Sequence, residues 1–206
     1  MEQTYSLTEG NIGSTLLRFA IPFLLASFLQ ALYGAADLYV VGKFDTAAGV
    51  SAVAIGSQVM QTITGIVLGI STGGTVLLGR CVGERNWKAA AYAIGTIGIV
   101  FLILAMVVTP VMLLLTENIL LAMETPQEAF ASAKSYLMIC SAGIPFIVGY
   151  NAVSGIFRGL GDSKTPLYFI FLACVLNVGM DFLLVGAFHM GAAGAGLATF
   201  LSNCVA

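Results

Sequence analysis

Charged side chains are scarce in this sequence. Only 9% of the 206 residues are Asp, Glu, Lys or Arg, against about 25% in an ordinary soluble domain, while 59% are hydrophobic and the mean hydropathy is +0.99. The net charge is −2, so the basic surface that nucleic acid requires is missing. The four cysteines are spaced too widely for a metal-binding motif. These absences exclude a soluble globular domain and a nucleic-acid partner.

Long apolar runs take the place of the missing charges. Runs of about 20 residues recur along the whole chain, and that length crosses a bilayer core of about 30 Å. We therefore predict an all-α membrane protein, folded as one six-span transmembrane helical bundle over residues 1–206. The last span stops about 15 residues after it starts, so we expect it to be truncated and the chain to be a fragment. The predicted spans lie near 15–41, 50–78, 89–115, 131–157, 165–188 and 192–206.

The distribution of Lys and Arg predicts the orientation of the bundle. Six of the eight basic residues fall before the first span or in the connections that follow the second and fourth spans, and only Lys43 and Lys134 fall on the other side. Because basic residues accumulate in cytoplasmic loops, we expect a multi-pass protein of the cell (inner) membrane with a cytoplasmic N-terminus. The six residues are Arg18, Arg80, Arg85, Lys88, Arg158 and Lys164.

Two aspartates, Asp37 and Asp181, lie inside predicted spans. An ionisable group within the bilayer costs about 2.5–3.5 kcal/mol on insertion scales and therefore indicates a functional site. At about 1.5 Å per helical residue, Asp37, Asp181 and Thr199 all lie roughly 9–12 Å below the outer boundary. Asn177 precedes Asp181 by four residues and projects from the same helix face. The common depth predicts that these four residues share one site.

The four side chains offer carboxylate, amide and hydroxyl groups. Their oxygen atoms suit a hard cation such as Na⁺, and the same groups form a hydrogen-bond network that can hold a protonated carboxyl. The sequence therefore predicts an ion-coupling site for H⁺ or Na⁺, with no cofactor, and leaves the choice of ion open. The alternative is that each buried aspartate only bonds to neighbouring backbone.

Other polar residues in the spans are candidates for a cavity lining or for an extension of the network. Gln30 and Tyr33 lie two turns and one turn before Asp37 on a similar helix face, and Tyr136 and Asn151 lie in the fourth span. For each of them alone, ordinary hydrogen bonding between helices is an equally open interpretation.

Four segments resemble the multidrug and toxic compound extrusion (MATE) family of transporters, and the resemblance runs over essentially the whole chain in order and spacing. Members of that family have two bundles of six helices around a central cavity. The chain is similar to the N-terminal bundle alone, so the C-terminal six-helix bundle is an expected partner. The four segments are Leu7–Asp45, Gly79–Ala91, Arg158–Leu167 and Gly191–Phe200.

The resemblance implies secondary active antiport, in which cationic drugs or other xenobiotics leave the cell in exchange for H⁺ or Na⁺. It implies that the N-terminal half carries the coupling site, and the family pattern falls on Asp37, Asn177, Asp181 and Thr199. Tyr136 and Asn151 match the tyrosine and asparagine of the fourth span. The expected partners are an organic cation, the lipid bilayer and the second bundle, and no enzymatic activity is expected.

The sequence offers three alternatives to antiport. Gly159–Asp162 matches the G-x-G-D pattern of intramembrane aspartyl proteases, but it lies in a predicted cytoplasmic turn, on the opposite side of the membrane from Asp37. A channel would need a ring of polar groups along its pore, which the sequence does not show. A flippase for lipid-linked oligosaccharides would share the fold, but it would need basic residues facing the cavity, where this sequence places acidic ones.

Overall fold

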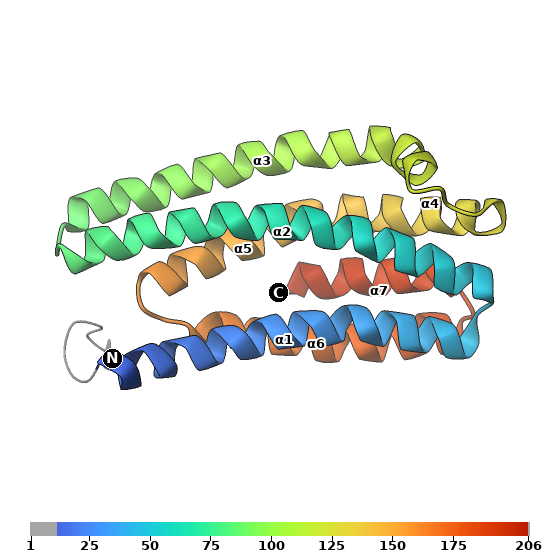
Figure 1. Ribbon diagram of the computed structural model, residues 1–206, viewed down its shortest axis with the longest axis horizontal. Coiled ribbons are helices and arrows are strands. Elements are labelled where there is room, and N and C mark those ends of the chain that lie inside the picture. The colour runs from blue at the N-terminus through green and yellow to red at the C-terminus, as the bar shows by residue number, and fades with distance from the viewer. Residues whose placement is uncertain (1–11, 206) are drawn as a thin grey trace.

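A computed structural model describes residues 12–205, and these residues are helical almost throughout (Figure 1). Five long segments and the short helix α7 run back and forth along the same axis, and two of the long segments are divided. The elements are α1 (Ile12–Phe44), α2 (Ala47–Gly83), α3 (Trp87–Ala122), α4 (Gln127–Ala142), α5 (Ile144–Gly159), α6 (Lys164–Asp181), the π-helix η1 (Phe182–Ala187) and α7 (Gly191–Val205).

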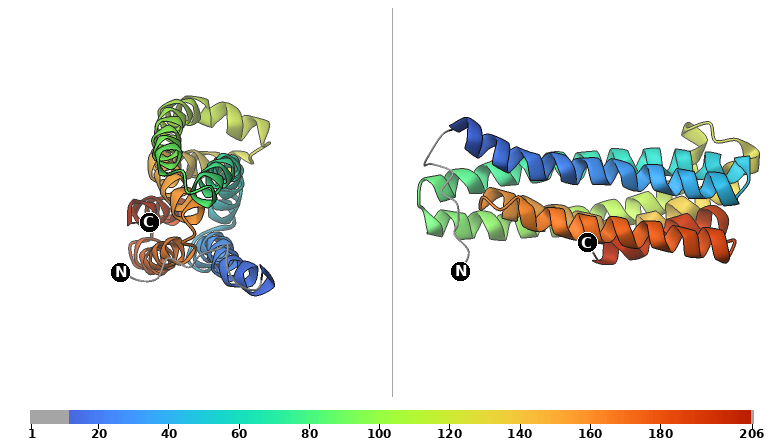
Figure 2. Two further views of the ribbon diagram at one scale, coloured as in Figure 1. Left: turned by 90° about the vertical axis from the view of Figure 1, so that its left-hand side faces the viewer. Right: turned by 90° about the horizontal axis from the view of Figure 1, so that it is seen from below.

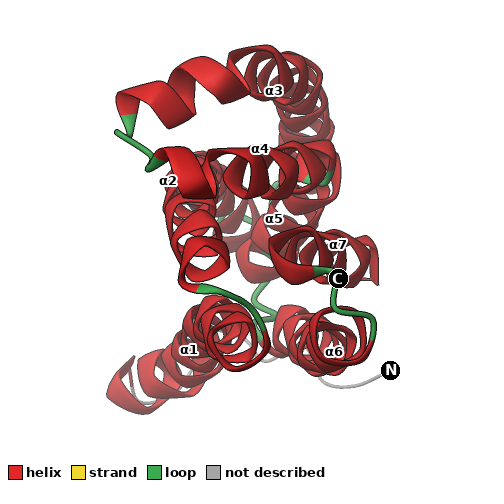
Figure 3. Cartoon of the chain, turned by 90° about the vertical axis from the view of Figure 1, so that its right-hand side faces the viewer, coloured by secondary structure: helices red, strands yellow, loops and turns green. Residues whose placement is uncertain are grey.

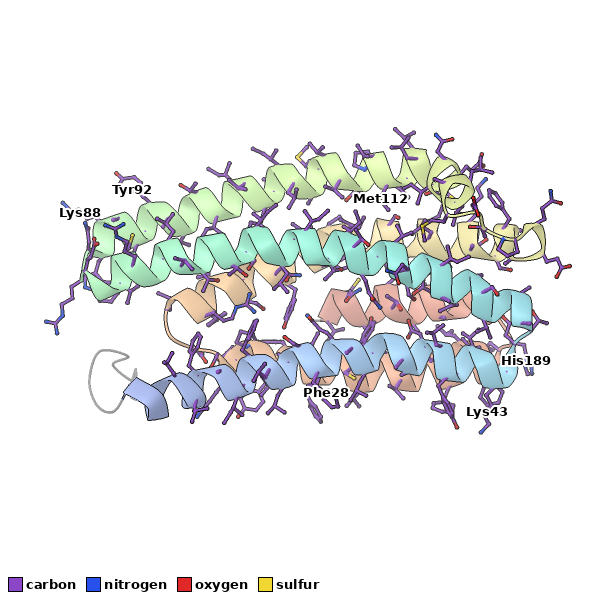
Figure 4. The ribbon with its side chains drawn as sticks, in the orientation of Figure 1. Phe28, Lys43, Lys88, Tyr92, Met112 and His189 are labelled. Carbon is purple, nitrogen blue, oxygen red and sulfur yellow. The ribbon has the colours of Figure 1, made fainter. Side chains whose placement is uncertain are left out.

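We call the two ends of the bundle the Lys88 end and the Lys43 end, after residues that are labelled in Figure 4. The turn between α2 and α3 lies at the Lys88 end, together with the start of α1 and the turn between α5 and α6. The other turns lie at the Lys43 end, where His189 leads into α7. The described part of α7 starts at the Lys43 end and stops midway along the bundle (Figure 1).

The helices pack as two neighbouring groups, which Figure 3 shows end on. One group pairs α1 with α6, and the other packs α2 against α4 and α5, with α3 outside them. The short helix α7 lies between the groups and contacts both α4 and α6. Its small residues allow this position, because Gly194, Ala195 and Gly196 let neighbouring backbones come close. α7 therefore connects the two groups at the Lys43 end.

Local sequence accounts for most helix ends. The side chains of Thr46 and Asn86 each accept a hydrogen bond from a backbone amide three residues later, at Gly49 and Ala89. These bonds cap the N-termini of α2 and α3. Each later turn uses left-handed backbone geometry at one or two residues, with positive φ at Arg85, Glu124, Gly161, His189 and Gly191. The connections are consequently only a few residues long, and the chain reverses its direction at each of them.

Two predicted spans are not continuous α-helices. The span expected over 131–157 bends by 45° at Gly143, between α4 and α5. The reason is Pro145, which has no N–H to donate to the carbonyl of Ser141 four residues earlier. The span expected over 165–188 changes to π-helix immediately after Asp181. The bend is flanked by the buried residues Ser141 and Ile144, whereas the π-helix has one buried residue, Val185, and exposes Phe182 and Leu183 on its outer side.

Four helices in the described part of the chain are long and apolar enough to cross a membrane by themselves, and the bent pair of α4 and α5 makes a fifth. α7 is apolar but has only 15 residues. Large apolar side chains cover the outside of the bundle, as Phe28 does on α1, where 60% of its surface is exposed (Figure 4). Such a surface suits the hydrocarbon core of a bilayer, and the chain is a multi-pass helical membrane protein.

Glycines permit the closest helix contact in the bundle. The buried ring of Tyr136, on α4, lies directly against Gly56 of α2 and Gly196 of α7. A Cβ atom on Gly56 would come within 2.3 Å of the Tyr136 ring, whereas one on Gly65, farther along the same helix, would meet nothing within 4 Å. The packing of α2 on α4 therefore depends on the missing side chain at Gly56.

We expect Gly56→Ala to destabilise the bundle by about 1–3 kcal/mol, because the added methyl group overlaps a ring that has no room to move. Unfolding of the purified protein in mixed detergent micelles measures the change. Gly65→Ala is the matched control, since it adds the same group to an exposed position of α2 and should leave stability unchanged or slightly raised. Equal stability of the two variants would contradict the packing described here.

Candidate functional site

A cluster of buried polar side chains lies where α1, α6 and α7 meet. Asp37 on α1, Asn177 and Asp181 on α6 and Thr199 on α7 are each at least 90% buried. The hydroxyl of Thr199 donates a hydrogen bond of 3.0 Å to Oδ2 of Asp37 and so joins α7 to α1. The structure therefore brings together the four residues that the sequence places at one depth.

The remaining polar atoms of this cluster have no hydrogen-bond partner. They are one oxygen of Asp37, both oxygens of Asp181, and the amide oxygen and nitrogen of Asn177. The side chains of Asp181, Asn177 and Tyr136 are near enough to interact with the Asp37 carboxyl, but only Thr199 lies at hydrogen-bonding distance. Buried polar groups are nearly always satisfied, and leaving one unpaired costs about 1–3 kcal/mol. Four of these five atoms are oxygens, so the unpaired groups are mainly acceptors, to which a proton or a hard cation can bind.

Tyr33 has a definite structural role beside the cluster. It lies one turn before Asp37 on α1, and its hydroxyl donates to the backbone carbonyl of Thr199 at 3.0 Å and contacts the hydroxyl of Ser202. Ser202 in turn donates to the same carbonyl at 3.0 Å. These bonds hold α7 against α1 and fix the position from which the Thr199 hydroxyl reaches Asp37.

Ser57 and Ser202 are polar residues of this region that sequence reasoning missed. Ser57, on α2, shares a hydrogen bond of 3.0 Å with the hydroxyl of Tyr136. Ser202 follows Thr199 by three residues, and that spacing on one helix face was the available signal. A lone serine in an apolar span carries no such signal, so only the packing of α2 on α4 identifies Ser57.

The other candidate residues lie outside the cluster of carboxyl groups. The side-chain amide of Asn151 donates to the carbonyl of Ile147 within α5, at 2.8 Å, and the backbone carbonyl of Asn151 accepts from the hydroxyl of Ser71 on α2, at 2.7 Å. The bond between Ser71 and Asn151 thus connects α2 to α5. Gln30 is half-buried on α1, two turns before Asp37 toward the Lys88 end. Tyr136 alone of the two fourth-span residues approaches Asp37.

An apolar layer separates the cluster from the Lys43 end of the bundle. Val40 and Val41 on α1 and Val185 on η1 are completely or almost completely buried. The π-helix that contains Val185 begins directly after Asp181, and its first residue, Phe182, packs edge-on against Phe44 of α1. The carboxyl groups therefore lie in a low-dielectric interior, where a charge interacts more strongly than in water.

Asp162, the acidic residue of the G-x-G-D match, lies far from this cluster. It precedes α6, and Asp181 ends α6 about 25 Å farther along the helix. The Asp162 carboxylate accepts hydrogen bonds from the backbone amides of Lys164 and Thr165, at 2.9 and 3.1 Å, and from the Thr165 hydroxyl. It caps the first turn of α6, and within residues 12–205 the groups that interact with it are Lys164 and Thr165, neither of which is a carboxyl group.

Hydrogen bonding also determines the charge of Asp162. Partial burial by itself would raise the pKa of Asp162, but the bonds from Thr165 and Lys164 and the charge of Lys164 outweigh burial, so the pKa lies below its ordinary value. The carboxylate therefore stays ionised near neutral pH and complements the positive end of the α6 dipole.

Comparison with known proteins places the chain among membrane transporters. The family model MatE matches residues 22–183. The probable multidrug resistance protein YpnP of Bacillus subtilis is 33% identical over 204 residues, which are 99% of this chain and 46% of YpnP. The probable multidrug resistance protein YoeA of the same organism is 27% identical and is covered to 44%. The chain thus spans a little under half the length of these relatives.

Solved structures agree with this comparison. A crystal structure described as MATE in the bent conformation superposes with a TM-score of 0.89 at 28% identity, over 95% of this chain and 44% of the solved chain. An outward-facing multidrug resistance MATE transporter of the MOP superfamily gives a TM-score of 0.87 at 28% identity, with 95% and 43% covered. The similarity is therefore to one half of a longer transporter fold.

We expect Asp162→Ala to destabilise the protein by about 0.5–2 kcal/mol, because α6 loses its cap, and Asp162→Asn to cost less, because an acceptor oxygen remains. The depressed pKa means that the stabilisation by Asp162 is complete above about pH 4 and is lost as the pH falls through the folded-state value. Unfolding of wild type and Asp162→Ala in detergent, between pH 3 and pH 7, measures both effects. A stability difference that stays constant over that range would contradict the role of the carboxylate.

Proposed function

The chain belongs to the MatE family of transporters, and from that premise we propose that it is the ion-coupling N-terminal half of an antiporter. The complete transporter would consist of this bundle and a second six-helix bundle. It would export organic cations in exchange for H⁺ or Na⁺. The relatives are named as multidrug resistance proteins, and the family is one of transporters rather than enzymes, which supports this class of function.

The buried cluster of Asp37, Asn177, Asp181 and Thr199 is the observation that carries the proposal. Two carboxyl groups close together in an apolar interior repel each other when both are ionised, and desolvation adds to the cost. A bound Na⁺ or an added proton offsets both costs, because either one supplies positive charge to oxygens that have no donor. The site therefore favours an occupied state, which is the property that coupling to an ion gradient requires.

Both candidate ions fit the groups that are present. The unpaired oxygens of Asp37, Asn177 and Asp181 are the hard ligands that Na⁺ accepts, and the Thr199 hydroxyl lies beside them. A proton would instead be shared between the two neighbouring carboxyl groups, with the Asn177 amide as a further partner. The ion is here a transported substrate, and no resident cofactor is part of the proposal.

Transport requires that the ion and the drug bind differently to two conformations of the bundle. Occupation of the cluster would change the attraction among α1, α6 and α7, because these helices meet at the carboxyl groups. Pro22 lies in α1 on the Lys88 side of the cluster, and it removes one backbone hydrogen bond from that helix. α1 can flex there, and this would let a change at Asp37 alter the cytoplasmic side of the bundle.

The positions of the basic residues support the proposed orientation in the cell membrane. Arg80, Arg85 and Lys88 lie at the turn between α2 and α3, while Arg158 and Lys164 flank the turn between α5 and α6. These turns lie at the same end of the bundle, and Lys43 lies at the other (Figure 4). Lys134 belongs to α4, which begins at the Lys43 end (Figure 1). By the positive-inside rule the Lys88 end, with the start of α1, faces the cytoplasm.

We expect Asp181→Asn to abolish ion-driven efflux by the complete transporter while leaving it folded, because the amide cannot be charged or lose a proton. The measurement is accumulation of a cationic dye in vesicles, with an imposed pH gradient in one series and an imposed Na⁺ gradient in the other. The gradient that drives transport in the wild type identifies the coupling ion.

Glu128→Gln is the matched control, since it removes an exposed carboxylate from the first turn of α4, away from the cluster. It should transport as the wild type does. Wild-type efflux by Asp181→Asn would remove the basis for assigning the cluster to ion coupling. Wild-type transport that neither gradient drives would instead overturn antiport itself.

A further inference from the structure

Arg158 joins the two groups of helices in the half of the bundle toward the Lys88 end. It belongs to the last turn of α5, which lies between α2 and the pair of α1 and α6 (Figure 2, left). Nη2 of Arg158 donates a hydrogen bond of 3.3 Å to the hydroxyl of Ser71 on α2. Its guanidinium carbon lies 5.4 Å from the centroid of the Phe23 ring on α1. One side chain of α5 thus reaches both α2 and α1, and we call these two interactions the Arg158 contact.

Other links between α1 and the second group are sparse in this half of the bundle. The described part of α7, which connects the groups at the Lys43 end, stops midway along the bundle (Figure 1). Within residues 12–205 the backbones of α1 and α5 do not pack against each other. No hydrogen bond leads from residues 19–32 of α1 to the described parts of α2 or α5. The Arg158 contact therefore spans a distance that the helix backbones do not close.

Close packing of α5 on α2 fixes the hydroxyl that Arg158 binds. Ser71 is buried and donates to the backbone carbonyl of Asn151 at 2.7 Å, so the oxygen of its hydroxyl remains free to accept from Arg158. The Thr75 hydroxyl lies 3.0 Å from the carbonyls of both Ser71 and Gly155. A Cβ atom on Gly155 would come within 2.4 Å of the Ser71 hydroxyl oxygen. The acceptor for Arg158 is therefore held in place before the guanidinium reaches α1.

The chemistry of the Arg158 contact makes it reversible. A planar guanidinium within about 6 Å of a ring centroid is attracted to the ring face, and it keeps N–H groups for a hydroxyl, which an ammonium does less well. Within residues 12–205 no carboxylate pairs with Arg158, and its side chain is only partly buried. Because both partners are uncharged, breaking the contact leaves no unpaired carboxylate behind, and water can solvate the released guanidinium.

The contact holds α1 next to its proline. Phe23 directly follows Pro22, at which α1 lacks one backbone hydrogen bond. Asp37 follows Phe23 by 14 residues, which is two repeats of seven, so both side chains project from a similar face of α1. At about 1.5 Å per residue they lie about 21 Å apart along the helix. α1 is thus bound at two levels, by Arg158 beside Pro22 and by Thr199 at Asp37.

We propose that Arg158 is a positioning residue, which holds α1 through the Phe23 ring against α2 and α5 in the half of the bundle toward the Lys88 end. Loss of the contact lets the start of α1 move away from α2, because α1 can flex at Pro22. That the contact opens and closes during transport rests on the antiport proposed above. That it sets the position of α1 depends only on the packing of this bundle.

Distances between pairs of spin labels test the proposal in the complete transporter, purified in detergent and freed of its native cysteines. The first pair, Leu17→Cys on α1 and Leu77→Cys on α2, lies toward the Lys88 end at exposed positions. The second pair, Tyr39→Cys and Ala54→Cys, reports on the same two helices toward the Lys43 end. The measurement needs neither an ion gradient nor a drug, so its result is independent of whether the protein is an antiporter.

Phe23→Leu and Arg158→Lys should each shift the distances of the first pair to longer values and leave those of the second pair unchanged. Phe23→Tyr keeps an aromatic ring and should retain the wild-type distances at both pairs. Arg80→Gln is the matched control, since it removes a basic side chain that pairs with Glu84 on the exposed surface at the same end.

Two results would overturn the proposal. First-pair distances that stay as in the wild type in either Phe23→Leu or Arg158→Lys would reduce the contact to ordinary packing, even if that variant unfolds more easily in detergent. An equal shift at both pairs would indicate general loosening of the bundle instead of a local release of α1. Because either substitution removes the contact, a variant that fails to fold leaves the other to decide the outcome.

Discussion

The Asp37 and Asp181 carboxyl groups are buried close together, and none of the four side chains that interact with Asp37 is basic. An apolar bundle with almost no other buried charge must offset the cost of these two groups, and hydrogen bonding does so only in part, through Thr199. Whatever supplies positive charge to the cluster also stabilises the contact of α1, α6 and α7. In the proposed antiport, binding of an ion at the cluster would therefore be linked to the arrangement of these three helices.

The rest of the fold serves to hold α7 in place. This short helix carries Thr199 and lies between the two groups of helices, with glycines where α4 and η1 come closest. Tyr33 binds it to α1 through the carbonyl of Thr199, and the ring of Tyr136 lies between Gly196 of α7 and Gly56 of α2. A change at the carboxyl groups can thus reach both groups of helices through contacts that are already formed.

The irregular backbone elements lie close to the site or at one end of the bundle. The π-helix follows Asp181 directly, and π-helical turns occur frequently at functional sites. Within it, Phe182 packs edge-on against the ring of Phe44, and Gly186 lies beside the same ring. The last turns of α3 run sideways across the Lys43 end of the bundle, as two views show (Figures 2 and 3). Each irregularity lies within a long apolar stretch that could otherwise form one straight α-helix.

The sequence by itself determined the fold class, and it predicted one common depth for Asp37, Asp181 and Thr199. Apolar run length, charge placement and helical rise depend only on local composition and on the thickness of the bilayer. Tertiary structure alone decided which side chains meet: that Thr199 bonds to Asp37, that Asn151 bonds within α5, and that Ser57 supports Tyr136. The π-helix also belongs to this second class, since residues 182–187 contain no proline or polar side chain to mark it. Such contacts depend on how glycines, rings and branched side chains fit between neighbouring helices, and that fit exists only once the helices are packed.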